Sequence, residues 1–305
     1  MKKNDKKLIV VCGPTASGKT SLGVKIAAAF NGEIISSDSR QVYRGMDIGT
    51  GKDLAEYKID GKTIPFHCID IADPDENFTL YHYIDHCHDA IKKIFGRKKT
   101  PIIVGGTGLY IEAILQKYRI PAVPADPDLR DSLKQKEAAE LTQKLKTLDR
   151  EIYEQTDLSS KKRIIRSIEI ALYKQNNPLR YAGDNPPDFN PVVLAVYHTR
   201  ENLKSSISWR LRERIDQGMI HEVENLLHMG VLPERLIFFG MEYKFITLYL
   251  TNKLSLEEAL TLLETEIHRL AKRQMTWFRG MGKRGIKLHW IKGNLEDEAM
   301  KILYS

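Results

Sequence analysis

Cysteine is scarce in this chain. Only three cysteines occur among 305 residues, and no two of them have the spacing of a CxxC motif. A disulfide framework and a zinc ribbon are therefore excluded, because both require paired cysteines. We expect Cys12, which ends an apolar run, to be a small buried side chain.

Long hydrophobic runs are also missing. The first seven residues contain four lysines, and no stretch is apolar enough for a signal peptide or a membrane span. The sequence has no internal repeat and no low-complexity tract, and its 42% hydrophobic and 29% charged residues are ordinary for a globular protein. We therefore expect a cytoplasmic protein that binds no membrane.

The charge balance is modestly basic, with 47 lysines and arginines against 40 acidic residues and a net charge of +7. From Arg269 to Lys287 the chain carries seven basic residues and no acidic one. A second basic cluster consists of Lys161, Lys162, Arg163 and Arg166. One basic run alone is as often a solvated helix face as a nucleic-acid contact. Two such runs in a chain with a phosphate-binding motif favour nucleic acid as a partner.

That motif is GPTASGKT at residues 13–20, directly after the apolar run Leu8–Val11. It fits the pattern GxxxxGK[ST] at a junction between a strand and a helix, where backbone N–H groups surround phosphate oxygens. A lysine adds a point charge there, and a hydroxyl can bind Mg²⁺. We predict a polyphosphate site formed by Gly13, Pro14, Thr15, Ala16, Ser17, Gly18, Lys19 and Thr20.

Strand and helix patterns alternate in the first part of the chain. We expect strands at 7–12, 33–37, 66–70, 101–105 and 192–197, with helices at 18–30 and 79–95. This order predicts an α/β fold, a doubly wound parallel sheet like that of P-loop NTPases. We assign residues 1–117 and 190–305 to this catalytic core.

The stretch 118–189 differs in character from the rest of the chain. Its prolines mark the two ends, its leucines recur at helical spacing, and no convincing strand pattern interrupts it. We predict a helical insertion domain. Farther on, Ser255 and Glu258 form a capping box that begins a helix ending near Gly280, and 287–291 predicts a strand at the sheet edge.

Two turns of this sheet carry further candidates for chemistry. Asp38 follows an apolar strand, so it lies at the same carboxyl edge as the phosphate loop, where ligands bind in such sheets. It could hold a metal or accept a proton, or it could cap a helix or a turn. Gly105–Gly108 follows another strand and offers flexible backbone in place of an acidic residue.

For two further groups of residues, the sequence does not decide between a structural and a functional role. His82 and His86 share a helix face, but they lack a third ligand, so surface or packing roles are favoured over a metal site. Arg210, Arg212 and Arg214 alternate along a helix. At most two of these arginines can face a bound phosphate, and the spacing does not choose among them.

Four separated motifs together resemble the tRNA dimethylallyltransferase family, in order and over about residues 8–290. They are the phosphate loop GPTASGKT, the segment Ile35–Thr50, the segment Val104–Tyr110 and AKRQMTWFR at 271–279. The chain departs from the usual family pattern at Gly51–Asp53, Ser160–Arg163 and Gly240–Lys244.

The resemblance implies transfer of a dimethylallyl group from its diphosphate to the exocyclic amine of an adenosine. That adenosine lies 3′ to the anticodon in tRNAs that read U-initial codons. Asp38 is then the general base, Thr15 and Arg214 stabilise the leaving diphosphate, and Mg²⁺ is the cofactor, held by Thr20. The implied partners are the tRNA anticodon stem-loop and dimethylallyl diphosphate, with no stable protein partner. The residues that correspond to tRNA contacts are Asp38, Ser39, Arg40, Gln41, Thr107, Arg130, Lys162, Arg163, Ile164, Ile165 and Arg166.

Two alternatives stay open beside this reading. An enzyme that prenylates free AMP or ADP has a similar phosphate loop but little use for the helical insertion and the basic segment. A P-loop kinase of small molecules is the other alternative.

Overall fold

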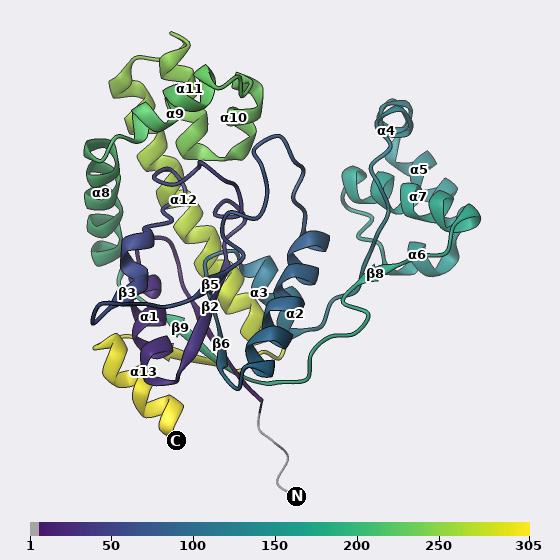
Figure 1. Ribbon diagram of the computed structural model, residues 1–305. Coiled ribbons are helices and arrows are strands. Elements are labelled where there is room, and N and C mark those ends of the chain that lie inside the picture. Colours follow the sequence, from purple (N-terminus) through teal and green to yellow (C-terminus); the bar gives the residue numbers. More distant parts are fainter. Residues whose placement is uncertain (1–5) are drawn as a thin grey trace, which may run out of the picture. The chain divides into compact units, whose positions relative to one another are not determined.

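The computed structural model describes residues 6–305. Its centre is a six-stranded sheet in the order β10-β9-β1-β6-β2-β5, in which every neighbouring pair is parallel (Figure 1). The predicted fold class, a doubly wound parallel α/β sheet, is therefore confirmed. The strands are β1 Lys7–Cys12, β2 Gly32–Ser37, β5 Phe66–His67, β6 Thr100–Gly105, β9 Asn190–Val196 and β10 Leu288–Ile291.

The central strands are apolar because both faces of the sheet are covered. Helices α1 (Lys19–Ala29) and α13 (Leu295–Tyr304) pack on one face, where their side chains join a core with Ile9, Val11 and Ile102. Helices α2 (Leu80–Gly96), α3 (Gly108–Leu115) and part of α12 (Leu256–Lys283) lie on the other side. Cys12 is fully buried in β1, as predicted.

A helical layer follows β9 in the chain. It consists of α8 Arg200–Asp216, α9 Met219–His228, α10 Pro233–Phe239, α11 Met241–Leu250 and the first half of α12. The predicted capping box of α12 is present, because Ser255 N donates to Glu258 Oε2 at 2.8 Å and Glu258 N donates to Ser255 Oγ at 3.2 Å. Buried Phe239, Tyr243 and Leu263 form the core of this layer.

The chain divides into two compact units. One ends at Lys117 and resumes from Pro186 to Ser305, and the other is Tyr118–Asn185. The second unit has its own core of leucines and isoleucines, and its helices are α4 Pro127–Lys134, α5 Ala138–Leu148, α6 Arg150–Gln155 and α7 Lys161–Asn176.

Two strand pairs lie outside the main sheet. In the second unit β7 (Ile120–Pro121) pairs antiparallel with β8 (Tyr181–Ala182), so the prediction that no strand interrupts this stretch was wrong. A strand of two residues is too short to show the alternation of apolar and polar residues that predicts a strand. The other pair is β3 (Lys58–Ile59) with β4 (Lys62–Thr63), after the short 3₁₀ helix η1 (Leu54–Tyr57).

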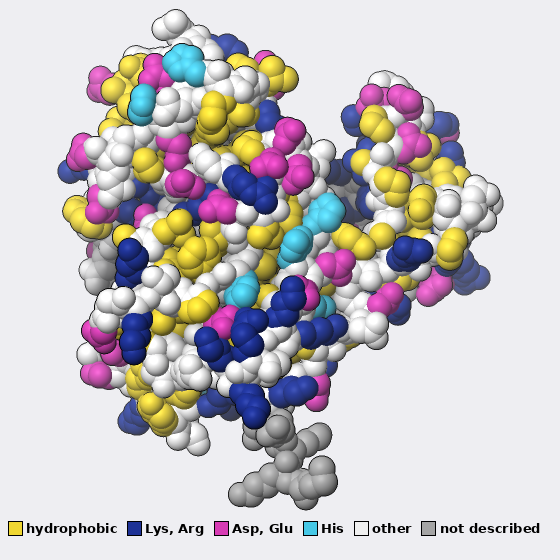
Figure 2. All heavy atoms as spheres, viewed as in Figure 1, with side chains coloured by type: hydrophobic (Ala, Val, Ile, Leu, Met, Phe, Trp, Pro, Cys, Tyr) yellow, Lys and Arg dark blue, Asp and Glu magenta, His cyan; other side chains and the backbone are white. Residues whose placement is uncertain are grey.

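Charged side chains of both signs are interspersed on the face of the molecule drawn in Figure 2. In the part of the chain from residue 6 onward, no helix combines the length and the apolar character needed to cross a membrane.

Candidate functional site

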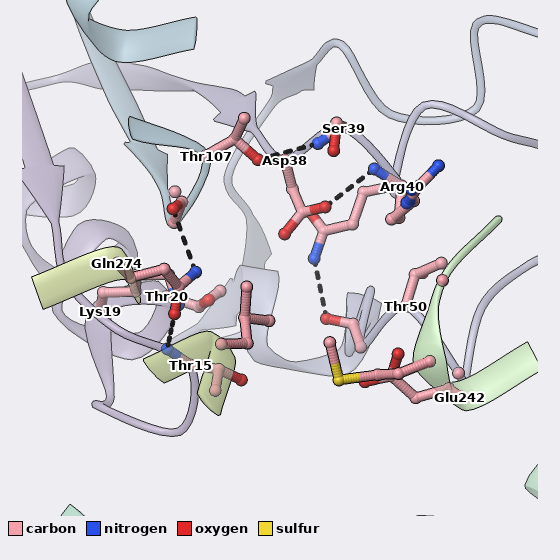
Figure 3. A pocket seen from close by; sticks show the side chains of 18 of the residues that line it. Thr15, Lys19, Thr20, Asp38, Ser39, Arg40, Thr50, Thr107, Glu242 and Gln274 are labelled. Carbon is pink, nitrogen blue, oxygen red and sulfur yellow. Dashed lines mark hydrogen bonds between the residues drawn. The ribbon is translucent and has the colours of Figure 1, made fainter. Parts of the chain in front are cut away.

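A polar pocket of about 480 Å³ opens where β1, β2 and β6 end (Figure 3). The phosphate loop forms one wall, and the turns after β2 and β6 form the next. Helices α8, α11 and α12 close the remaining sides. The polar and charged side chains that line it are Thr15, Lys19, Thr20, Asp38, Ser39, Arg40, Gln41, Thr50, Tyr57, Thr107, Arg210, Arg214, Glu242, Tyr243, Arg273 and Gln274.

The phosphate loop contains a left-handed backbone conformation at one of its glycines. Gly18 has φ +74° directly before α1 begins, a left-handed conformation that favours glycine. Lys19 Nζ donates to Pro14 O at 3.2 Å. Burial, together with the nearby charge of Arg210, lowers the pKa of Lys19 to about 8. Ser17 Oγ is buried without a hydrogen-bond partner among the described residues, but Ser17 does not line the pocket.

Asp38 lines the pocket at the end of β2, as its place in the sequence predicted. Its Oδ1 accepts a hydrogen bond from Arg40 N at 2.9 Å, and Ser39 N donates to Thr107 Oγ1 at 3.1 Å. The turn-capping role and the pocket position thus occur together. These bonds fix the carboxylate against the wall of the cavity, a prerequisite for a positioned base.

The structure also decides among the three arginines of α8. Arg210 and Arg214 line the pocket, whereas Arg212 is exposed to solvent. Arg210 forms an ion pair with Asp53. Arg214 is only 9% exposed, and its Nε has no hydrogen-bond partner in the described chain. Lys19, Arg210 and Arg214 therefore bring three cationic side chains to one cavity.

The model of the family described as IPP transferase matches residues 41–281. The chain belongs to the IPP transferase family. Two similar relatives are tRNA dimethylallyltransferase 1 of Parabacteroides distasonis, 46% identical over 95% of this chain and 94% of that protein, and tRNA dimethylallyltransferase 2 of Porphyromonas gingivalis, 47% identical over 97% and 99%.

Solved structures agree with this membership. The tRNA isopentenylpyrophosphate transferase of Bacillus halodurans is 32% identical with a TM-score of 0.70, and the alignment covers 98% of this chain and 95% of that one. A eukaryotic dimethylallyltransferase acting on tRNA has a TM-score of 0.74 at 25% identity, over 97% of this chain and 77% of that one.

In this IPP transferase Gln274 is a site residue that the sequence alone did not single out. From α12 its Oε1 accepts a hydrogen bond from Thr15 N at 2.9 Å, and its Nε2 donates to Gly106 O at 3.0 Å (Figure 3). One side-chain amide thus joins the phosphate loop to the glycine turn. The sequence contained one signal for this role: Gln274 belongs to the motif at 271–279, which is one of the four motifs that carry the family resemblance.

The glycine turn after β6 requires its small residues. A Cβ on Gly105 would lie 2.1 Å from Ser37 O, and one on Gly108 would lie 2.3 Å from the Trp277 ring. Close approach to β2 and α12 therefore explains these two glycines.

Not every residue of the predicted phosphate site faces this pocket. Thr15, Lys19 and Thr20 line it, whereas Ala16 and Gly18 line a neighbouring hollow that also contains Arg210. Close packing explains why a glycine occupies position 13, because a Cβ there would lie 2.9 Å from Ser17 Oγ and 3.0 Å from the Val196 side chain.

Six residues predicted to contact tRNA lie in the unit Tyr118–Asn185. Arg130 and Arg166 both bond to the buried carboxylate of Glu169. Ile164 and Ile165 are buried in the core of this unit, so these two residues offer almost no accessible surface to RNA. The exposed side chains of the set are Lys162 and Arg163. These RNA contacts stay predictions.

His82 has a structural role, as the sequence favoured. Its Nδ1 accepts a hydrogen bond from Thr79 N at 3.1 Å in the capping box of α2. In the described residues no group of three His, Cys, Asp or Glu side chains is arranged to hold a metal.

Proposed function

We propose that this IPP transferase moves a dimethylallyl group from dimethylallyl diphosphate to the exocyclic amine of an adenosine in tRNA. The position we propose is the adenosine 3′ to the anticodon, in tRNAs that read U-initial codons. The observation that carries the proposal is that the phosphate loop and Asp38 line one pocket. Relatives that share 46% or more of their residues with this chain bear the name tRNA dimethylallyltransferase.

The pocket suits a diphosphate as leaving group. Breaking the allylic C–O bond leaves negative charge on the diphosphate, and fixed cations there stabilise the transition state. Lys19, Arg210 and Arg214 supply such charge. The unpartnered Arg214 Nε is a donor without an acceptor, and phosphate oxygens provide the acceptor that a buried donor needs.

The nitrogen must lose a proton as the new bond forms. The amine attacks the allylic carbon, a C–N bond replaces the C–O bond, and the diphosphate departs with the C–O electron pair. Asp38 accepts the proton from the amine, and the Arg40 and Thr107 contacts of its turn hold it in place. Thr15 presents its hydroxyl at the diphosphate end of the pocket, while its N–H is bonded to Gln274 Oε1, which fixes this part of the phosphate loop.

We propose Mg²⁺ as the cofactor. The pocket offers the hydroxyl of Thr20 but no carboxylate cluster within the described residues. This donor set fits Mg²⁺, which takes few protein ligands and binds mainly through substrate phosphates and water. When bound, the ion neutralises charge on the departing diphosphate.

Exposed basic residues of both units suit a tRNA partner. Arg40 and Arg273 line the cavity, and α12 continues with exposed Lys272, Arg279 and Lys283. In the other unit, Lys162 and Arg163 are exposed on α7. Contacts of this kind to the RNA backbone offset the cost of unstacking the target base, about a few kcal/mol.

The test is to incubate the protein with dimethylallyl diphosphate, Mg²⁺ and either unmodified tRNA or AMP, and to analyse the nucleosides by mass spectrometry. We expect prenylated adenosine in the tRNA and none from AMP. Transfer to AMP alone would establish the adenylate prenyltransferase instead. A parallel incubation replaces dimethylallyl diphosphate with ATP, and phosphoryl transfer there without any prenyl transfer in the first incubation would establish a kinase.

A further inference from the structure

Glu222 of α9 is bonded to a segment far from it in sequence. Its Oε2 accepts hydrogen bonds from Asp47 N at 2.8 Å and Ile48 N at 2.7 Å. Its Oε1 accepts from Gly49 N at 3.0 Å and from the Tyr243 hydroxyl at 2.7 Å. A carboxylate that receives three successive backbone N–H groups holds a loop firmly, because bonds to a charged acceptor are stronger than neutral ones.

The same loop forms part of the pocket wall. Gly49, Thr50 and Gly51 line the cavity. Lys52, next in the chain, is buried and donates to Tyr43 O at 2.6 Å and to Asp47 Oδ1 at 2.7 Å. The loop is therefore held at its start by Glu222 and at its end by Lys52.

Gly51 is where this loop meets Arg214. A Cβ on Gly51 would lie 1.8 Å from Arg214 Nη2, so the guanidinium lies directly against the Gly51 backbone. Gly51 O also accepts a hydrogen bond from Gln41 Nε2 at 2.9 Å, and Gly51 N donates to Ile48 O at 3.1 Å. A shift of residues 47–49 therefore moves the surface on which Arg214 rests.

We propose that Glu222 is a positioning residue for Arg214, acting through the loop 47–51. Glu222 does not line the pocket itself. It keeps the loop amides in register, the loop keeps Gly51 under the guanidinium, and the guanidinium faces the diphosphate. The inference rests on the proposed function for the diphosphate role of Arg214.

The alternative is that Glu222 only stabilises the fold. A double-mutant cycle separates the two roles, since a residue that acts through Arg214 has no effect left once Arg214 is gone. The test measures the affinity of the intact chain for inorganic diphosphate in the presence of Mg²⁺, by titration calorimetry. The proteins compared are the wild type, Glu222→Gln, Arg214→Ala and the double variant. The glutamine places an N–H₂ group against backbone donors, so the loop must shift.

We expect Glu222→Gln to weaken diphosphate binding about tenfold in the wild-type background and less than twofold in the Arg214→Ala background. Glu224→Gln is the matched control, because Glu224 lies on the same helix with a 48% exposed side chain beside His221, and it should bind diphosphate as the wild type does. Equal losses in both backgrounds, or no loss in either, would overturn the proposal.

Gly51→Ala provides a second route if Glu222→Gln does not fold. It pushes the guanidinium aside from the other end of the same linkage, although the alanine is also strained at φ +67° and its Cβ lies 3.3 Å from Arg210 Nη2. Most of its loss of diphosphate binding should therefore disappear in the Arg214→Ala background, and an undiminished loss there contradicts the linkage. Because the probe is inorganic diphosphate, a failure to prenylate tRNA would refute the proposed function while leaving this coupling to stand or fall by its own result.

Discussion

Arg214 Nη1 lies 3.9 Å from Glu242 Oε1 in the wall of the pocket. Burial raises the pKa of Glu242, and the charge of Arg214 opposes that rise. The carboxylate offsets part of the positive charge that a diphosphate meets, because it lies beside a cation of the same cavity. We therefore expect the pair to weaken the binding of both the diphosphate product and the substrate.

Removing that negative charge should strengthen diphosphate binding. We expect Glu242→Gln to lower the Kd for inorganic diphosphate about fivefold, which corresponds to roughly 1 kcal/mol of binding free energy. Titration calorimetry at pH 8 measures it, with wild type as reference. Weaker binding by the variant would mean that Glu242 orients Arg214 rather than opposing its charge.

Asp38 provides the test of the proton transfer. Asp38→Ala should lower kcat by about 10²-fold or more, as expected for loss of a general base. The affinity for tRNA should be largely kept, which a filter-binding assay measures alongside turnover. A collapse of tRNA binding would instead make Asp38 primarily a recognition residue.

Lys19 predicts a pH dependence of diphosphate binding. Its pKa of about 8 means that the amine is charged below that pH and neutral above it. An anion binds the charged form, so the Kd for inorganic diphosphate should rise by up to about fivefold from pH 8 to pH 9. Lys19→Arg stays charged over this range and should remove that rise. An identical pH profile in both proteins would contradict the assignment.

Glu33 predicts a pH dependence of stability. Burial favours a raised pKa for this carboxyl, but hydrogen bonds from Arg97, His67 and Lys99 hold it at about 2. The folded pKa is below the unfolded value of 4.5, so the stabilisation is present above pH 4.5 and is lost as pH falls toward 2.

Glu33→Gln should lower the free energy of unfolding at pH 7 by about 1–3 kcal/mol. It should also flatten the loss of stability between pH 5 and pH 2. Urea unfolding at several pH values measures both effects. A variant that follows the wild-type acid profile would show that other carboxyl groups control it.

The sequence predicted the features whose signals are local. GPTASGKT occupies eight consecutive residues and follows a clear apolar strand, so both the loop and the edge that bears it could be placed. Asp38 could be placed at the same edge because parallel strands end together. Ser255 and Glu258, three residues apart, likewise specified the start of α12.

The rest of the site depends on contacts between distant residues. Gln274 reaches Thr15 across 259 positions, and Glu222 reaches Asp47 across 175. Local spacing encodes neither contact, although Gln274 belongs to the motif at 271–279 on which the family resemblance rests. Helical spacing alone allows more than one face of α8, and the resemblance named only Arg214, so the place of Arg210 in the pocket required the packing of this helix.

The most direct test of the central claim uses a matched pair of anticodon stem-loop RNAs with dimethylallyl diphosphate and Mg²⁺. One carries adenosine 3′ to the anticodon, and the other carries inosine there, which has an oxygen in place of the exocyclic amine. We predict prenyl transfer to the adenosine RNA and none to the inosine RNA. Equal transfer to both would contradict attack by that amine.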